Sequence, residues 1–93
     1  MTDQAVSFGQ PEQILIRTLL YPVIFESKIM DGIDRVIRLT QEQPTGASEE
    51  QMLEAIRRAL ASDFPLEKIL PQPHPDAAIR AFLRELERRL VSG

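Results

Sequence analysis

Cysteine is absent from the 93-residue sequence. Its absence excludes disulfide bonds, thiolate metal ligands, iron–sulfur clusters and cysteine nucleophiles. A small domain without a disulfide bond is typical of a reducing compartment rather than of a secreted scaffold. Residues 1–9 also show neither the positive region nor the apolar region of a secretory signal. We therefore expect a cytoplasmic protein.

Long apolar runs, an excess of basic residues and clustered glycines are missing as well. The longest apolar run, residues 14–25, contains Arg17 and Pro22 and is much shorter than the roughly 20 residues of a membrane span. The net charge is −3, which disfavours the phosphate neutralisation that supplies most nucleic-acid affinity. The 4 glycines are dispersed, so no phosphate-binding loop can be drawn. We expect no membrane insertion and no nucleic-acid partner.

The residues that could carry chemistry lack the partners that chemistry needs. His74 is the only histidine; it lies between two prolines, where we expect exposure, and no metal-binding spacing surrounds it. Asp31 with Asp34, and Glu50 with Glu54, share helix sides, but arginine or lysine interleaves with them or they fall in a first helical turn. The sequence therefore predicts no catalytic residue, no metal ligand and no cofactor.

Helix-forming composition and regular apolar spacing predict an all-α fold. Apolar residues make up 43% and charged residues 27% of the chain, which is a globular composition. We expect a flexible arm over residues 1–9 and a single helical domain over residues 10–93, built as a bundle of three to four helices. The predicted helices span residues 11–41, kinked or broken near Pro22, then 48–62, a short turn at 65–70, and 75–91.

Local signals support these boundaries. Pro11 and Glu12 suit a helix start, and Ser48 opens a capping-box pattern. Four-residue spacing predicts the ion pairs Asp31–Arg35, Asp34–Arg38, Glu54–Arg58 and Glu85–Arg89. The predicted core comprises Ile16, Leu19, Val23, Met30, Ile33, Ile37, Leu53, Ile56, Leu60, Ile69, Phe82, Leu83, Leu86 and Leu90.

Residues 14–25 form the candidate interaction site. On a helix their apolar side chains leave almost no polar face, and a chain this short can hardly surround such a helix. A buried strand and a wholly internal core helix remain alternative interpretations. We expect the run to form a partner interface through Ile14, Leu15, Leu19, Leu20, Tyr21, Ile24 and Phe25.

A second candidate surface is a stripe of arginines on the last predicted helix. Arg80, Arg84 and Arg88 recur every four residues, with Glu85 and Glu87 among them. The interleaved acids favour a solvated face. The alternatives are contact with an acidic protein partner and, less favoured, contact with nucleic acid.

The sequence therefore predicts a small non-catalytic protein–protein interaction module: a regulator, inhibitor, adaptor or assembly subunit. We expect it to work through its apolar helical surface as a homodimer or small homo-oligomer. The alternative is a carrier or sensor that holds a small apolar ligand between its helices.

Overall fold

The computed structural model describes residues 8–42, 49–70 and 72–92, and within them the chain is helical with no strand. The α-helices of this part are α1 (Gln10–Leu20), α2 (Ile33–Glu42), α3 (Glu49–Ala61) and α4 (Asp76–Ser92). Three short 3-10 turns join them: η1 (Tyr21–Val23), η2 (Ile29–Gly32) and η3 (Leu66–Lys68). The predicted all-α bundle is confirmed.

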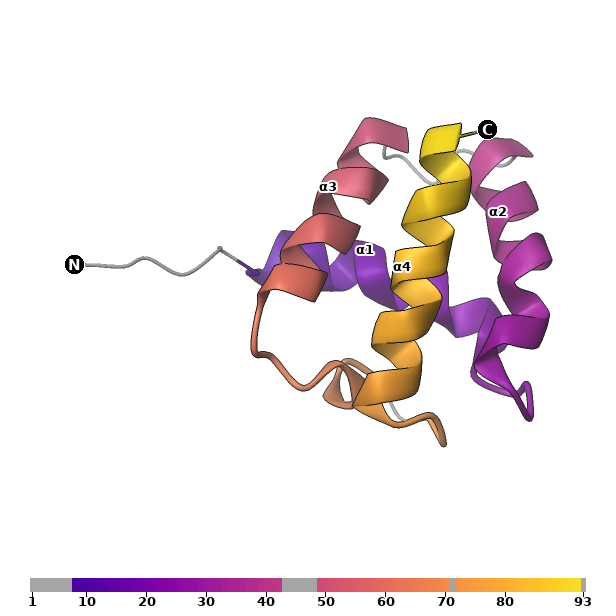
Figure 1. Ribbon diagram of the computed structural model, residues 1–93. Coiled ribbons are helices and arrows are strands. Elements are labelled where there is room, and N and C mark those ends of the chain that lie inside the picture. Colours follow the sequence, from indigo (N-terminus) through magenta and orange to yellow (C-terminus); the bar gives the residue numbers. More distant parts are fainter. Residues whose placement is uncertain (1–7, 43–48, 71, 93) are drawn as a thin grey trace.

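The helices enclose one core. In Figure 1, α4 runs between α3 and α2, and α1 crosses behind them. α1 packs mainly against α3, and α4 packs against α3 and α2. The buried apolar side chains are Ile16, Leu19, Leu20, Val23, Ile29, Ile33, Val36, Met52, Ala55, Ile56, Ala59, Leu66, Leu70, Ile79, Phe82, Leu83, Leu86 and Leu90.

The start of α1 is held by its own first turn. The Gly9 N–H donates to Glu12 Oε1 at 3.0 Å, and the Gln13 N–H donates to the Gly9 carbonyl at 3.0 Å. The Phe8 ring meets the Phe64 ring edge-on, with 5.6 Å between the ring centroids. Phe8 and Gly9 therefore belong to the fold, whereas residues 1–7 of the predicted arm lie outside the described residues.

The chain changes its hydrogen bonding at Pro22, where the sequence predicted a kink or break. α1 ends at Leu20 and the 3-10 turn η1 follows, because proline has no N–H to continue an α-helix. Residues 24–28 form no helix, and α2 begins only at Ile33. The helix predicted over residues 11–41 is thus not continuous: it is wrong over residues 24–28, and residues 29–32 form the 3-10 turn η2.

This difference changes which side chain enters the core. Ile29 is 6% exposed, whereas Met30, a predicted core residue, is 38% exposed. A 3-10 turn advances by three residues per turn instead of 3.6, so the α-helical stripe does not apply there. Other predicted core residues are only partly buried against the cluster, namely Ile37, Leu53, Leu60 and Ile69.

Two predicted ion pairs are also replaced. Asp31 lies in η2 and not in an α-helix, so it does not face Arg35. Arg35 instead donates to the Pro22 carbonyl at 3.3 Å and lies 3.4 Å from Glu26. Asp34, predicted to pair within α2, is bound by Arg89 of α4 at 2.8 Å.

The remaining helix ends follow the sequence closely. Glu49 and Glu50 occupy the first turn of α3, at the positive end of its dipole, while the predicted cap Ser48 lies outside the described residues. The predicted pairs Glu54–Arg58 and Glu85–Arg89 are confirmed, each at 2.8 Å. No helix of the described residues is long and apolar enough to cross a membrane.

Candidate functional site

The apolar run at residues 14–25 has a buried side and an exposed side. Residues 14–20 are helical, which excludes the strand interpretation. Leu19 and Leu20 face the core, and Leu15 and Ile24 are partly buried against it. The large side chains left outside are Ile14 at 57% exposure, Tyr21 at 61% and Phe25 at 89%.

An apolar groove of about 570 Å³ opens between α1 and α2. Ile14, Arg17 and Thr18 are spaced three and four residues apart, which places them on one side of α1, and Tyr21 follows in η1. We call this feature the α1–α2 groove; it is lined by Ile14, Arg17, Thr18, Leu19, Tyr21, Pro22, Val36, Leu39, Thr40 and Met52. Two of the three large exposed side chains of the run, Ile14 and Tyr21, therefore stand on its wall, whereas Phe25 does not.

The polar groups of the groove are mostly used within their own helices. The Thr18 hydroxyl donates to the Ile14 carbonyl at 3.0 Å, and the Thr40 hydroxyl donates to the Val36 carbonyl at 2.8 Å. Arg17 has no ion pair or side-chain hydrogen bond with any residue that the structure describes. The groove thus presents an apolar surface with one available cation at its edge, which suits an apolar occupant carrying an acid.

The predicted arginine stripe serves largely internal contacts. Arg80 is the most enclosed member, because its side chain is 15% exposed. Its Nε donates to Asp76 Oδ2 at 2.7 Å and its Nη2 donates to the Phe64 carbonyl at 2.9 Å. Its Nη1 lies 3.3 Å from the carbonyl oxygens of Ala59 and Leu60, at the end of α3. Arg80 therefore caps α3 from α4 instead of facing a partner.

The other two arginines of the stripe differ from each other. Arg88 binds Glu85, which Arg89 also binds from the same helix. Arg84 is exposed and has no partner within the described parts of the chain. Of the three predicted contact residues, Arg84 is thus the one whose charge is available to an external partner.

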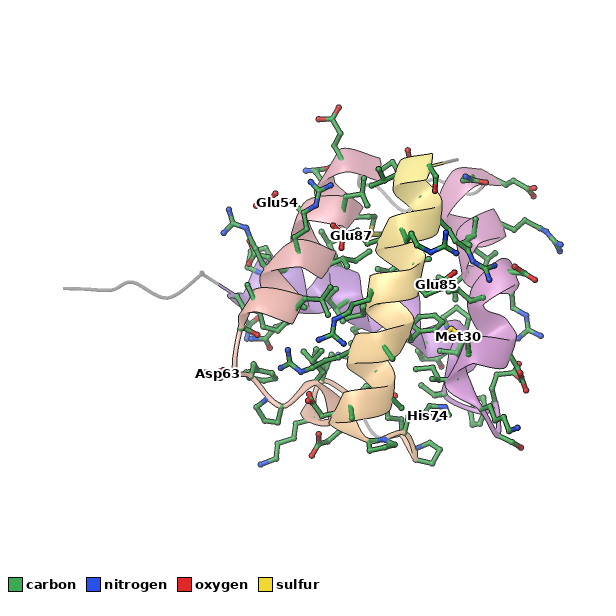
Figure 2. The ribbon with its side chains drawn as sticks, in the orientation of Figure 1. Met30, Glu54, Asp63, His74, Glu85 and Glu87 are labelled. Carbon is green, nitrogen blue, oxygen red and sulfur yellow. The ribbon has the colours of Figure 1, made fainter. Side chains whose placement is uncertain are left out.

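These contacts lower the pKa of two carboxyl groups. Hydrogen bonds from Arg88 and then Arg89 lower the pKa of Glu85 to about 2. Figure 2 shows Glu85 on the α2 side of α4 and Glu87 on its α3 side, where Glu87 binds Arg57. Burial raises the pKa of the Asp76 carboxyl, but the hydrogen bond from the Leu66 N–H and the contact with Arg80 outweigh it, so that this pKa is lowered.

His74 lies in the fold rather than outside it. The expectation that it is exposed is wrong, because only 6% of the residue is accessible. Its Nε2 lies 3.0 Å from the Val23 carbonyl oxygen, and since a carbonyl only accepts, Nε2 carries the proton. Figure 2 shows His74 in the loop before α4. Its hydrogen bond links this loop to η1, which gives His74 a structural role.

The described residues contain no group of three His, Asp or Glu side chains placed to hold a metal ion. Comparison with protein-family models, curated proteins and solved structures found no match to the chain. The α1–α2 groove is consequently interpreted from its own geometry and chemistry.

Sequence reasoning missed one wall of this groove. Val36, Leu39 and Thr40 have the spacing of one helix side, and this signal is visible in the sequence. Nothing local, however, shows that this side of α2 meets the outer side of α1. Met52 of α3 also lines the groove, and nothing local predicts this either, because the packing of α3 on α1 brings it there.

Proposed function

We propose that this chain is a non-catalytic protein–protein interaction module that binds through the α1–α2 groove. The observation that supports the proposal is the exposure of Ile14 and Tyr21, each more than half accessible, on the wall of an apolar groove. Contiguous apolar surface on a small protein often marks a partner site, because the exposure of apolar surface to water is unfavourable and its burial by a partner lowers the free energy.

We further propose that the partner is a second copy of the chain. A twofold pairing needs one surface that carries both the projecting groups and the hollow that receives them. The α1–α2 groove meets this condition, since Ile14 and Tyr21 project from the wall of the groove itself. Each copy can therefore place its exposed side chains against the apolar lining of the other.

The test is the dissociation constant of the dimer, measured by sedimentation equilibrium across a wide concentration range. Ile14→Asp has a matched control in Val91→Asp, because Ile14 is 57% and Val91 60% exposed and both lie on helices. Loss of half-buried aliphatic surface in both copies corresponds to about 2–3 kcal/mol, so we expect Ile14→Asp to raise the dissociation constant at least about 30-fold. Val91→Asp should leave the dissociation constant unchanged, because Val91 does not line the groove.

Folding is verified by thermal unfolding at a protein concentration at which the parent and both variants are monomeric, because dissociation of a dimer would itself lower the melting temperature. There both variants should match the parent, since both side chains are exposed. A parent chain that is monomeric throughout the concentration range would refute self-association. Equal weakening by Ile14→Asp and Val91→Asp would place the interface elsewhere.

A second candidate function is favoured by the size of the groove. Its volume of about 570 Å³ falls within the roughly 300–1,000 Å³ typical of small-molecule sites, and Arg17 could bind an anionic head group. Decanoate, added below its micelle-forming concentration, is the probe: a carrier gains thermal stability with this ligand, and Arg17→Met removes the gain. A monomeric chain whose thermal stability rises with decanoate, and no longer rises after Arg17→Met, would support the carrier and overturn the dimer proposal.

The proposal places the module in the cytoplasm, as expected from the lack of cysteine. It includes no nucleic-acid partner. The net charge of −3 and the internal use of Arg80 and Arg88 support this part of the proposal.

A further inference from the structure

The two halves of α2 are held unequally in the fold. Ile33 and Val36, in the first half, are buried in the core at 3% and 1% exposure. None of residues 37–42 is buried, and Ile37 is only partly buried against the core. We call residues 37–42 the α2 end. Because buried apolar surface holds a helix to its fold, the α2 end is attached more weakly than the start of the helix.

The polar contacts of α2 show the same difference. Arg89 of α4 binds Asp34, and Arg35 donates to a carbonyl of η1, so both of these links to other elements come from the first half. In the α2 end, Thr40 donates to the Val36 carbonyl of its own helix. Within the described residues, no side chain of the α2 end forms a hydrogen bond or ion pair with another element.

The last turn of α2 is also electrostatically unfavourable. It holds no basic residue and finishes at Glu42, whose negative charge opposes the helix dipole. The same chain offers a comparison at the end of α3, where Ala59 is fully buried and Arg80 donates to the Ala59 and Leu60 carbonyls. A helix end that has neither buried side chains nor a cation in its last turn opens at a low cost in free energy.

The α2 end forms part of the α1–α2 groove. Leu39 and Thr40 line the groove from the α2 end, whereas Val36 lines it from the buried half of the helix. Opening of the chain from residue 37 onward therefore takes Leu39 and Thr40 away from the α1 side of the groove. An occupant of the groove favours the closed form, because only that form offers the complete wall.

We infer that the α2 end is a movable wall: it opens locally while the rest of the fold stays intact, and an occupant of the α1–α2 groove orders it. Figure 1 shows α2 at the outer edge of the bundle, on the other side of α4 from α3. The ordering rests on the proposed function, which supplies the occupant, whereas the local opening does not. The affinity of the groove is reduced by the fraction of chains that are open.

Hydrogen exchange of single backbone amides, followed by NMR and corrected for intrinsic rates, tests the local opening. It is measured at a concentration at which the chain is monomeric, or on Ile14→Asp. We expect the amides of Leu39 and Thr40 to exchange at least about 100-fold faster than those of Arg58 and Ala59, which lie equally far from the end of α3. Equal protection of the two helix ends would overturn the inference.

A pair of substitutions in α4 separates local opening from global unfolding. Glycine in a helix interior is less favourable than alanine by an amount that corresponds to about 5-fold in an equilibrium constant. Arg84 is exposed on α4 and does not line the groove. We expect Arg84→Gly to speed exchange at Leu86 about 5-fold relative to Arg84→Ala and to leave Leu39 unchanged, because α4 stays folded when the α2 end opens. An equal rise at Leu39 would overturn the inference, since exchange there would then require global unfolding.

The same amides report the ordering of the α2 end. When the parent chain is concentrated from monomer to dimer, exchange at Leu39 and Thr40 should slow at least about 10-fold, because the open form cannot hold the occupant. Ile14→Asp at the same concentration should show no slowing. If the parent chain stays monomeric, decanoate is added as the occupant and the same slowing is expected.

The outcomes distinguish this inference from the proposed function. A dimer that is weakened by Ile14→Asp but shows no slowing at Leu39 keeps the proposed function and overturns the ordering of the wall. A chain that neither dimerises nor binds decanoate overturns the ordering together with the proposed function. In that case the two Arg84 variants still decide the local opening, because they need no occupant.

Discussion

Replacement of Arg80 by methionine tests the internal role that the structure gives this side chain. Methionine keeps most of the apolar stem and removes the guanidinium. Two short charge-assisted hydrogen bonds are lost, to Asp76 at 2.7 Å and to the Phe64 carbonyl at 2.9 Å. Such bonds contribute about 1.5–3 kcal/mol each, and water replaces part of them because the side chain is 15% exposed. We expect the free energy of unfolding to fall by about 3 kcal/mol.

The measurement is urea unfolding at one fixed protein concentration, so that self-association does not alter the comparison. With an m value of about 1.5 kcal/mol/M, the expected loss lowers the urea midpoint by about 2 M. Arg80→Lys should lose about 2 kcal/mol, because one ammonium group cannot reach both Asp76 and the Phe64 carbonyl as the planar fork does. Arg84→Met is the control, and as an exposed change it should stay within about 0.5 kcal/mol.

Similar midpoints for Arg80→Met and Arg84→Met would refute this reasoning. That result would mean that solvent satisfies the last carbonyls of α3 as well as Arg80 does. It would also return Arg80 to the candidates for an acidic partner contact.

Gly32→Ala should lower the melting temperature in calorimetry by the equivalent of about 1–3 kcal/mol, because the new Cβ would lie 2.3 Å from Val23 Cγ1 in the core; an unchanged melting temperature would contradict this packing. The Glu85 carboxyl has its pKa lowered from 4.5 to about 2, so its ion pairs stabilise the fold fully above pH 4.5 and lose that effect as the pH falls toward 2. Glu85→Gln should therefore flatten the acid limb of stability in this window, whereas Glu67→Gln, at an exposed site, should not; identical limbs would show that the Glu85 contacts add no stability. His74→Phe keeps a ring but loses the bond to the Val23 carbonyl, which still accepts a backbone N–H at 3.1 Å, so we expect a loss of about 1 kcal/mol in urea unfolding. If His74→Phe is as stable as the parent, the hydrogen bond to the Val23 carbonyl adds no stability and His74 contributes by packing alone.

Local sequence signals placed the last two helices well. Pro75 and Asp76 mark the start of α4, and the acids before Met52 mark the start of α3. The pairs Glu54–Arg58 and Glu85–Arg89 were predictable for the same reason, because four-residue spacing acts within one helix.

Contacts between distant segments were not predictable in this way. His74 was expected in solvent because prolines flank it, yet the fold brings it to the Val23 carbonyl, 51 residues away. Arg80 was expected to face outward, yet it reaches the end of α3, 20 residues or more before it. Met30 was expected in the core, yet it is exposed and only its neighbour Ile29 is buried, because a 3-10 turn replaced the expected α-helix.

The sequence by itself determined that residues 14–25, placed on a helix, are apolar on almost every side. It could not determine which arc of the helix stays outside, because an almost wholly apolar helix has no periodicity to orient it. The packing of α3 on α1 settled that question, because Leu19 and Leu20 are buried while Ile14 and Tyr21 stay exposed. Only the tertiary structure then placed Leu39 opposite them, since a groove exists only where two separately formed helices meet.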